Sequence, residues 1–250
     1  MAVMEVHRAN LINTTTMVGV PAAQTATVAY LFDNNRRVAF SSSGYNTTTA
    51  MTMTVAFNPP RVLSHLMLQN HNLKSFSIYA DTTTNVILST ATNSATSTYL
   101  SFASMTVSTL VLTLTDTIVA SREKSIGELV ATERRYQFER NPAIQDFKYT
   151  TERKQIRHVM PDGGVALFNI MDKYRTALKL EFFSQTSYDA LLSIYTDALP
   201  VFFVPFPTAT GWDGKGFETN WSGDFDFRYS TNVKSPGYTG TIVFEETPSA

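Results

Sequence analysis

The chain has 250 residues, of which 43% are hydrophobic and 16% are charged, and its formal net charge is −1. This length and composition fit a globular protein of one large or two small domains, and the small net charge gives no support for a nucleic-acid or membrane-surface partner. The absence of cysteine excludes disulfides, thiolate metal sites and cysteine nucleophiles.

No apolar run reaches the roughly 18 residues needed to span a bilayer, so we expect no membrane insertion. The N-terminal segment lacks the basic and apolar regions of a signal peptide. We therefore expect a protein that stays in the cytoplasm or leaves the cell by lysis or assembly.

Composition changes partway along the chain. Threonine and serine are crowded up to about Ala120, while charged and aromatic residues dominate from Ser121 on. This change predicts two domains, residues 1–121 and 122–250.

The first predicted domain consists of short strands. Residues 51–57 alternate apolar and polar side chains, as a half-buried strand does. Pro59 and Pro60 cannot donate to a strand ladder, so we expect them between strands. Short strands at regular spacing predict a β-sandwich or jelly roll. Further strands are predicted around residues 62–68, 76–78, 86–88 and 105–115.

Four polar residues, Gln69 to Asn72, interrupt this pattern and include an imidazole. We favour a chain corner here, because Asn and His tolerate left-handed backbone and bond local backbone groups. A metal site needs several convergent ligands, and only His65 is near His71 in sequence, with a different expected environment. A catalytic role needs a base held by an orienting group, and no such arrangement can be named.

The segments VAYLFDNNRRVAFSSSG and MTVAFNPPRVLSHLMLQNHNLKSFSIYAD resemble the discoidin, or coagulation-factor type C, jelly roll over roughly residues 10–120. The family commonly has Trp-Ser where this chain has Phe40-Ser41. The resemblance implies an eight-stranded sandwich with ligand-binding loops at one end and, in some members, a Ca²⁺ near the acidic loop. The residues that match the family's loop and corner are Asp33, Asn34, Asn35, Asn70, His71 and Asn72.

The residues themselves favour a solvated turn at Asp33. A Ca²⁺ ligand is the alternative, but this ion takes six to eight oxygen ligands and only a few are visible here. We therefore predict no cofactor from the residues, and Ca²⁺ enters only through the resemblance.

The second predicted domain is a β-sandwich or barrel-like unit with one helix. Tyr188, Leu191, Leu192 and Tyr195 share one helical face. They predict a helix over about residues 188–198, with Ser187 as its N-cap. Strands are predicted at residues 126–141, 176–183 and 201–207, with a hairpin at 154–170 and two closing strands.

Aromatic residues and carboxylates are mixed between residues 212 and 227. Stacking rings beside acid groups would suit a glycan groove or a glycosidase. We favour core packing, because Phe225 and Phe227 share one strand face while Asp224 and Asp226 share the other.

The order of a helix with LLSIY, then VFFVPFPTATGWDG, NWSGDFDF and a terminal GYTGTIVFEE resembles small β-domains of bacteriophage tails over about residues 122–250. Together the two resemblances imply a structural protein of the virion, in the distal tail or baseplate, assembled in the host cytoplasm. They imply a homo-oligomeric ring or sleeve beside other tail proteins, with the jelly roll facing outward.

These features predict a structural tail protein without enzymatic activity. The alternative is a carbohydrate-binding module or adhesin that contacts host-surface glycans through the jelly-roll loops. The apolar residues after the helix exceed what one strand and one helix can cover. We therefore expect Phe206 and Trp212 at a subunit interface, where aromatic side chains contribute strongly to binding.

Overall fold

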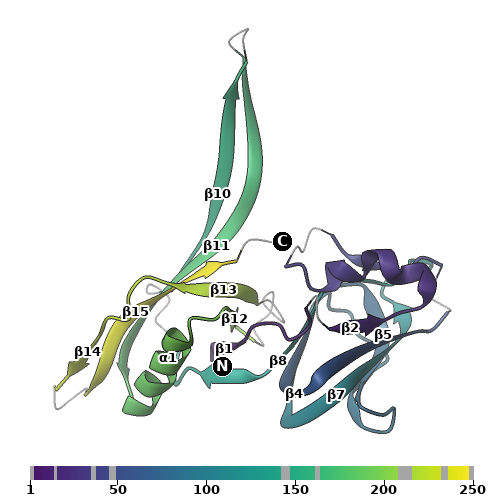
Figure 1. Ribbon diagram of the computed structural model, residues 1–250, viewed down its shortest axis with the longest axis horizontal. Helices are drawn as coiled ribbons and strands as arrows, with labels where there is room; N and C mark the ends of the chain where they lie inside the picture. Colours follow the sequence, from purple (N-terminus) through teal and green to yellow (C-terminus); the bar gives the residue numbers. More distant parts are fainter. Residues whose placement is uncertain are drawn as a thin grey trace.

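The computed structural model describes residues 3–13, 16–34, 38–44, 49–141, 147–160, 164–207, 216–231 and 236–247. The protein is mainly β with one α-helix, and its strands form two antiparallel sheets in a sandwich-like arrangement, as the sequence predicts. Figure 1 shows two lobes side by side and a long hairpin that stands away from both.

The smaller sheet has seven strands in the order β3-β8-β4-β7-β5-β6, with β2 paired to β4. Its two longest strands, β4 and β7, pair with two register shifts. The sheet encloses one hydrophobic core, and the alternating apolar side chains of residues 51–57 help to fill it. A 3-10 helix, η1 (Ala22–Leu31), belongs to the same lobe. The strands are β2 (Met17–Gly19), β3 (Phe40–Ser41), β4 (Met51–His71), β5 (Leu73–Ala80), β6 (Val86–Thr90), β7 (Thr98–Thr117) and β8 (Ser125–Thr132).

Pro59 and Pro60 lie inside β4, so the prediction that they separate two strands is wrong. The physical reason behind it still operates within the strand. The pairing of β4 with β7 shifts register between Ala56 and Arg61. Neither proline therefore holds a paired position on that ladder, where its missing N–H would be needed.

The larger sheet has eight strands in the order β10-β11-β15-β13-β12-β1-β9, with β14 paired to β15. Its inner face and the helix α1 (Gln185–Asp197) enclose a second core that is rich in aromatic side chains. The strands are β1 (Glu5–Arg8), β9 (Arg134–Gln137), β10 (Phe147–Val159), β11 (Val165–Phe183), β12 (Val201–Val204), β13 (Phe217–Ser222), β14 (Phe227–Ser230) and β15 (Gly237–Glu246).

The first and last strands of the described residues, β1 and β15, belong to the larger sheet. Strand β1 lies there between β12 and β9, while β8, at residues 125–132, belongs to the smaller sheet. The chain therefore passes from the smaller sheet to the larger sheet between Thr132 and Arg134, and not at residue 121. The domain boundary at residue 121, drawn from composition, stays a prediction.

The helix begins at Gln185, three residues before its predicted start, and its N-cap is Ser184. The prediction of Ser187 as N-cap is wrong, because the Ser184 Oγ accepts a hydrogen bond from the backbone N–H of Ser187, at 3.2 Å. Leu191 is buried as predicted, but Leu192 is exposed. Among the helices of the described residues, none is long and apolar enough to cross a membrane.

A small apolar cluster joins the two lobes. Met67 on β4 and Val130 on β8 pack with Phe202 and Val204 on β12. All four side chains are fully buried. The lobes therefore share a continuous interior at this point.

Candidate functional site

The most prominent surface feature is the far part of the β10–β11 hairpin, which we call the arm and define as residues 154–160 and 164–171. Strand β10 pairs along its length with β11, but β11 pairs with β15 only from Arg175 to Phe183. Among the described residues, no third strand therefore lies beside the arm (Figure 1). A two-stranded ribbon is marginally stable in water by itself.

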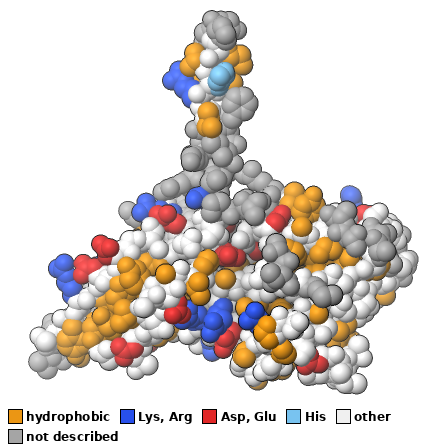
Figure 2. Space-filling model, viewed as in Figure 1, with side chains coloured by type: hydrophobic (Ala, Val, Ile, Leu, Met, Phe, Trp, Pro, Cys, Tyr) orange, Lys and Arg blue, Asp and Glu red, His pale blue; other side chains and the backbone are white. Residues whose placement is uncertain are grey.

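Both faces of the arm carry exposed apolar side chains. Val159 pairs with Val165, and Leu167, which is 61% exposed, follows two residues later on the same face. Ile156 lies on the opposite face and is also exposed. Figure 2 shows hydrophobic side chains on the upper part of the projection. Apolar surface on two faces of one ribbon is suited to a partner that encloses it.

The predicted loop at Asp33 lies at the junction of the lobes. Asn34 has a left-handed backbone, with φ of 56°, and its Nδ2 donates to Glu218 Oε2 on β13, at 3.1 Å. Burial raises the pKa of Glu218, against the effect of this hydrogen bond. Asn35 lies outside the described residues. Asp33 has partners of its own, and ligand binding by this loop stays a prediction.

The predicted corner at Asn70–Asn72 is held by internal hydrogen bonds. Asn70 has a left-handed backbone, with φ of 51°. The Asn72 side chain donates to the carbonyl of Glu123 at 2.7 Å and accepts from the N–H of Ser125 at 2.9 Å. It therefore fastens the end of β4 to the start of β8.

His71 is buried within the corner. Its Nδ1 accepts from the N–H of Leu73 at 3.1 Å, so Nε2 carries the proton and donates to Thr98 Oγ1 at 2.9 Å. Burial lowers the pKa of His71 to about 4. Both ring nitrogens are thus used by the fold, and ligand binding by His71 also stays a prediction.

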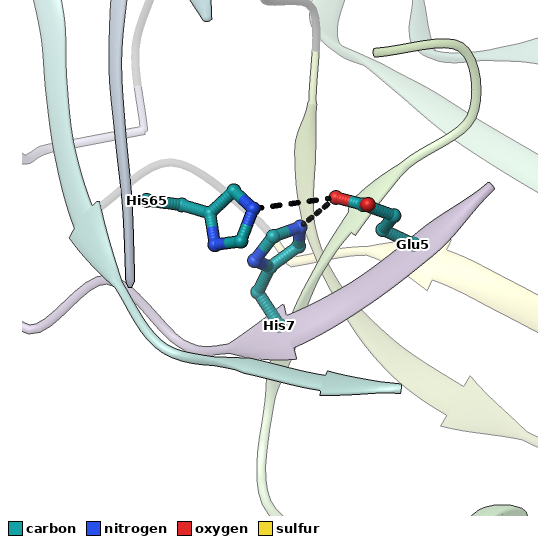
Figure 3. Close-up of side chains that lie close together, drawn as sticks. All are labelled: Glu5, His7 and His65. Atoms are coloured by element: carbon teal, nitrogen blue, oxygen red, sulfur yellow. Dashed lines mark hydrogen bonds and ion pairs between the residues drawn. The ribbon is translucent and has the colours of Figure 1, made fainter. Parts of the chain in front are cut away.

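A second group of ionisable residues lies between the sheets, and no sequence motif predicts it. Glu5 and His7 come from β1 and His65 from β4, and all three are buried (Figure 3). Glu5 Oε2 lies 3.1 Å from His7 Nε2 and 3.7 Å from His65 Nε2. One donor atom from each residue lies within 4.8 Å of the others, which is a geometry that could hold a metal ion.

Further residues complete this cluster. Arg134 Nη1 donates to Glu5 Oε1 at 3.0 Å, and the Tyr99 hydroxyl donates to Glu5 Oε2. Burial by itself raises the pKa of Glu5, but hydrogen bonds from His7, Tyr99 and Arg134 outweigh it and hold that pKa at about 2. Burial lowers the pKa of His65 to about 3 and also lowers that of His7. The cluster therefore holds a carboxylate and two neutral imidazoles at neutral pH.

The predicted aromatic region of the second domain is core, as the alternation of residues 224–227 indicates. Phe225 and Phe227 pack against the second core. Asp226 is exposed and pairs with Arg228. Phe206 is half-buried against the same core, while Trp212 lies outside the described residues. A subunit interface at these two residues stays a prediction.

A shallow pocket of about 540 Å³ opens beside this core, between the start of α1 and the β14–β15 hairpin. Tyr229 and Tyr238 line it, with ring centroids 5.0 Å apart, and Tyr229 is exposed. Glu139 and Gln185 add polar groups to the wall. Aromatic faces beside carboxylate and amide groups are suited to a polar ring-shaped ligand.

Sequence reasoning missed Glu5, His7 and the arm for different reasons. His7 is 58 positions from His65 in the chain, so no local spacing connects them. The sequence predicts a hairpin at residues 154–170 but does not show directly that this hairpin projects without a neighbouring strand. Apolar residues on both parities of two paired strands were the available signal for an unpartnered ribbon.

No protein-family model matches the chain, and no curated protein matches it. Solved discoidin-like jelly-roll modules resemble about half of it. A chitosan-binding module of a Paenibacillus sp. IK-5 chitosanase/glucanase has 15% identity and a TM-score of 0.42, covering 51% of this chain and 100% of the module.

Two further structures are similar to a comparable degree. The family 32 carbohydrate-binding module of Streptococcus pneumoniae EndoD has 13% identity and a TM-score of 0.41, covering 50% of this chain and 99% of the module. A family 32 module bound to GalNAc has 15% identity and a TM-score of 0.41, covering 49% and 99%. These scores are too low for the ligands of those modules to be carried over to this chain.

Proposed function

We propose that this chain is a structural, non-enzymatic subunit that assembles with copies of itself through the arm. The observation that carries the proposal is exposed apolar surface on both faces of a ribbon that no third described strand accompanies. Burying one Leu or Val side chain contributes about 1.5–3 kcal/mol. Several such side chains would therefore stabilise a contact between subunits.

A second copy of the chain is the partner that charge and topology favour. The charged residues of the arm, Lys154 and Arg157, are basic, whereas the whole chain has a net charge of −1, so the remainder is acidic on balance. The larger sheet is open, with β10 and β9 as its two ends. A contact between two different surfaces of identical subunits repeats head to tail and can close into a ring.

A bacteriophage tail is the setting that the sequence resemblance over residues 122–250 implies. The proposal extends to it: a ring or sleeve in the virion, assembled in the host cytoplasm beside other tail proteins. The arm supports the assembly part of this proposal, and the resemblance alone supports the viral setting.

Replacing Leu167 by Glu tests the arm. We expect wild-type protein to sediment as an oligomer at tens of micromolar and L167E to sediment as a smaller species in analytical ultracentrifugation. The substitution removes an apolar contact and places a carboxylate in it, which costs at least about 2 kcal/mol per contact, or more than tenfold in dissociation constant.

The matched control is Val86→Glu on β6, another exposed apolar strand residue, which lies in the other lobe. V86E should keep the wild-type sedimentation, and both variants should keep the wild-type circular dichroism. A wild-type chain that is monomeric throughout, or an equal loss of assembly in both variants, would contradict the proposal.

Carbohydrate binding is the second candidate function, and the pocket beside Tyr229 and Tyr238 is the observation that favours it. The jelly-roll loops that the sequence resemblance implies offer a different location, at Asn34. The two locations lie in different lobes and can be separated by substitution.

Isothermal titration with N-acetylgalactosamine and with chitosan oligosaccharides tests this candidate. Binding that weakens about fivefold or more in Tyr229→Ala but not in Asn34→Ala would place the site in the pocket, since stacking on an aromatic ring contributes about 1 kcal/mol or more. The reverse pattern would place it in the loops. Absence of binding to either sugar, extended to a glycan array, would remove the candidate.

A further inference from the structure

We propose that Glu5, His7 and His65 form a binding site for a divalent transition-metal ion of the Zn²⁺ type. The ion joins β1 of the larger sheet to β4 of the smaller sheet and so fastens the two lobes together (Figure 3).

The spacing of the donor atoms fits such an ion. Ligands about 2.0–2.1 Å from a tetrahedral metal lie about 3.3 Å from one another. Glu5 Oε2 lies 3.1 Å from His7 Nε2 and 3.7 Å from His65 Nε2, on either side of that value. Figure 3 shows both ring nitrogens directed at the same carboxylate oxygen. The three donors would supply three of the four ligands of a tetrahedral ion.

The donor set selects the class of metal. Two imidazoles and one carboxylate suit Zn²⁺, Co²⁺ or Ni²⁺, whereas Ca²⁺ requires an all-oxygen shell of six to eight ligands. This site is distinct from the acidic loop at Asp33 that the sequence resemblance associates with Ca²⁺.

An unpartnered nitrogen points independently to a ligand. His65 is 2% exposed, and its Nε2 has no hydrogen-bond partner in the described part of the chain. Leaving a buried polar nitrogen without a partner is costly, and a metal ion at the centre of the cluster would occupy its lone pair. His7 Nε2 donates to Glu5 Oε2 when no metal is bound, so a metal ion would take the place of this hydrogen bond and the proton of the neutral ring would move to Nδ1, which has no partner among the described residues.

Neighbouring groups hold the donors in position. Ser64 Oγ lies 2.7 Å from His65 Nδ1, so Nδ1–H can donate to this hydroxyl and leave the Nε2 lone pair for the metal. The Arg134 guanidinium bonds Glu5 Oε1, while Oε2 faces the histidines and also accepts a hydrogen bond from the Tyr99 hydroxyl. Arg134 also donates its backbone N–H to Ser64 Oγ, which links the outer contacts of both ligands.

Burial determines how the ion enters. The exposed fractions of Glu5, His7 and His65 are 4%, 0% and 2%, and the ligands come from both sheets. The site therefore forms only when the lobes close, and metal binding is coupled to folding. We expect the ion to load during refolding and to exchange slowly afterwards.

Refolding the full chain from urea with one equivalent of Co²⁺ tests the proposal, because tetrahedral Co²⁺ gives a strong visible absorption band. We expect the band in wild-type protein, its displacement when Zn²⁺ replaces Co²⁺ during refolding, and its loss in His65→Gln. The matched control is His71→Gln, which changes a buried histidine on the same strand outside the cluster and should keep the band.

The outcomes separate the alternatives. Absence of the band in refolded wild-type protein would overturn the proposal and leave a hydrogen-bonded cluster without a metal. An unchanged band in H65Q would show adventitious binding elsewhere, as at the exposed His158. If H65Q fails to refold by circular dichroism, His7→Gln and Glu5→Gln provide the same comparison. The oligomeric state of each variant, measured by sedimentation, tests the assembly proposal separately, because the metal site does not involve the arm.

Discussion

At the scale of single residues, His71 shows how a polar side chain within a corner serves the fold. Its Nδ1 lone pair accepts a hydrogen bond from the Leu73 N–H, and its Nε2–H donates a hydrogen bond to the Thr98 hydroxyl. Protonating Nδ1 would place two hydrogens against each other in a buried site. The low pKa of His71 thus has a geometric basis as well as a solvation basis.

This low pKa predicts a pH-dependent stability. Burial lowers the folded pKa of His71 from 6.5 to about 4, so between these values the unfolded chain binds the proton and the folded chain does not. The contribution of neutral His71 is complete above pH 6.5 and is lost as pH falls towards 4. The free energy of unfolding should fall by about 1 kcal/mol per pH unit from this residue.

Urea unfolding at several pH values between 4.5 and 7, compared between wild type and His71→Gln, measures this contribution. The variant should be less stable at pH 7 but should show a shallower decline on acidification. Equal slopes for the two proteins would show that His71 is not responsible. The difference between them also cancels the effect of carboxyl groups that titrate in the same range.

At the scale of elements, the helix α1 is defined by its first turn. Ser184 caps the N-terminus through its bond from Ser187, and both serine hydroxyls donate to Glu139. A carboxylate beside a helix N-terminus is favoured by the helix dipole. At the other end, Asp197 pairs with Arg135 on β9. These contacts orient the helix on the larger sheet.

Ser184→Ala should lower the free energy of unfolding by about 1 kcal/mol, because one orphan N–H loses its partner and Glu139 loses a donor. Chemical denaturation measures the change. Ser193→Ala is the matched control, since Ser193 is exposed in the middle of the same helix and alanine is at least as favourable there. Equal destabilisation by both substitutions would argue against the cap.

At the scale of the whole molecule, the chain joins two lobes by more than a linker. Strand β1 lies within the larger sheet, between β12 and β9, so the smaller sheet is inserted between two neighbouring strands of the larger one. The apolar contact of Met67 and Val130 with Phe202 and Val204 then closes the interior. The arm projects from the two lobes that are joined in this way (Figure 1).

The sequence by itself determined the mainly β character, several of the strands, the β10–β11 hairpin and the helix, but it did not mark β1, β2 or β3. Alternation over residues 51–57 and the turn residues around 161–164 are local signals, because side-chain direction follows the backbone period. The same signals placed Phe225 and Phe227 in the core. They misplaced the helix cap because Ser184 and Ser187 are both acceptable caps, and only the path of the chain from β11 selects the first.

Only the tertiary structure decided which strands are neighbours and which distant side chains meet. Glu5 and His7 reach His65 because β1 joins the larger sheet beside β9 and the two sheets close over Tyr99. Asn34 likewise reaches Glu218 across 184 positions. Periodicity states which face a residue occupies but not what lies opposite that face, since strand pairing and lobe contact depend on long-range burial. The longer alternating strands were therefore readable in the sequence, while β1 and the buried cluster between the sheets were not.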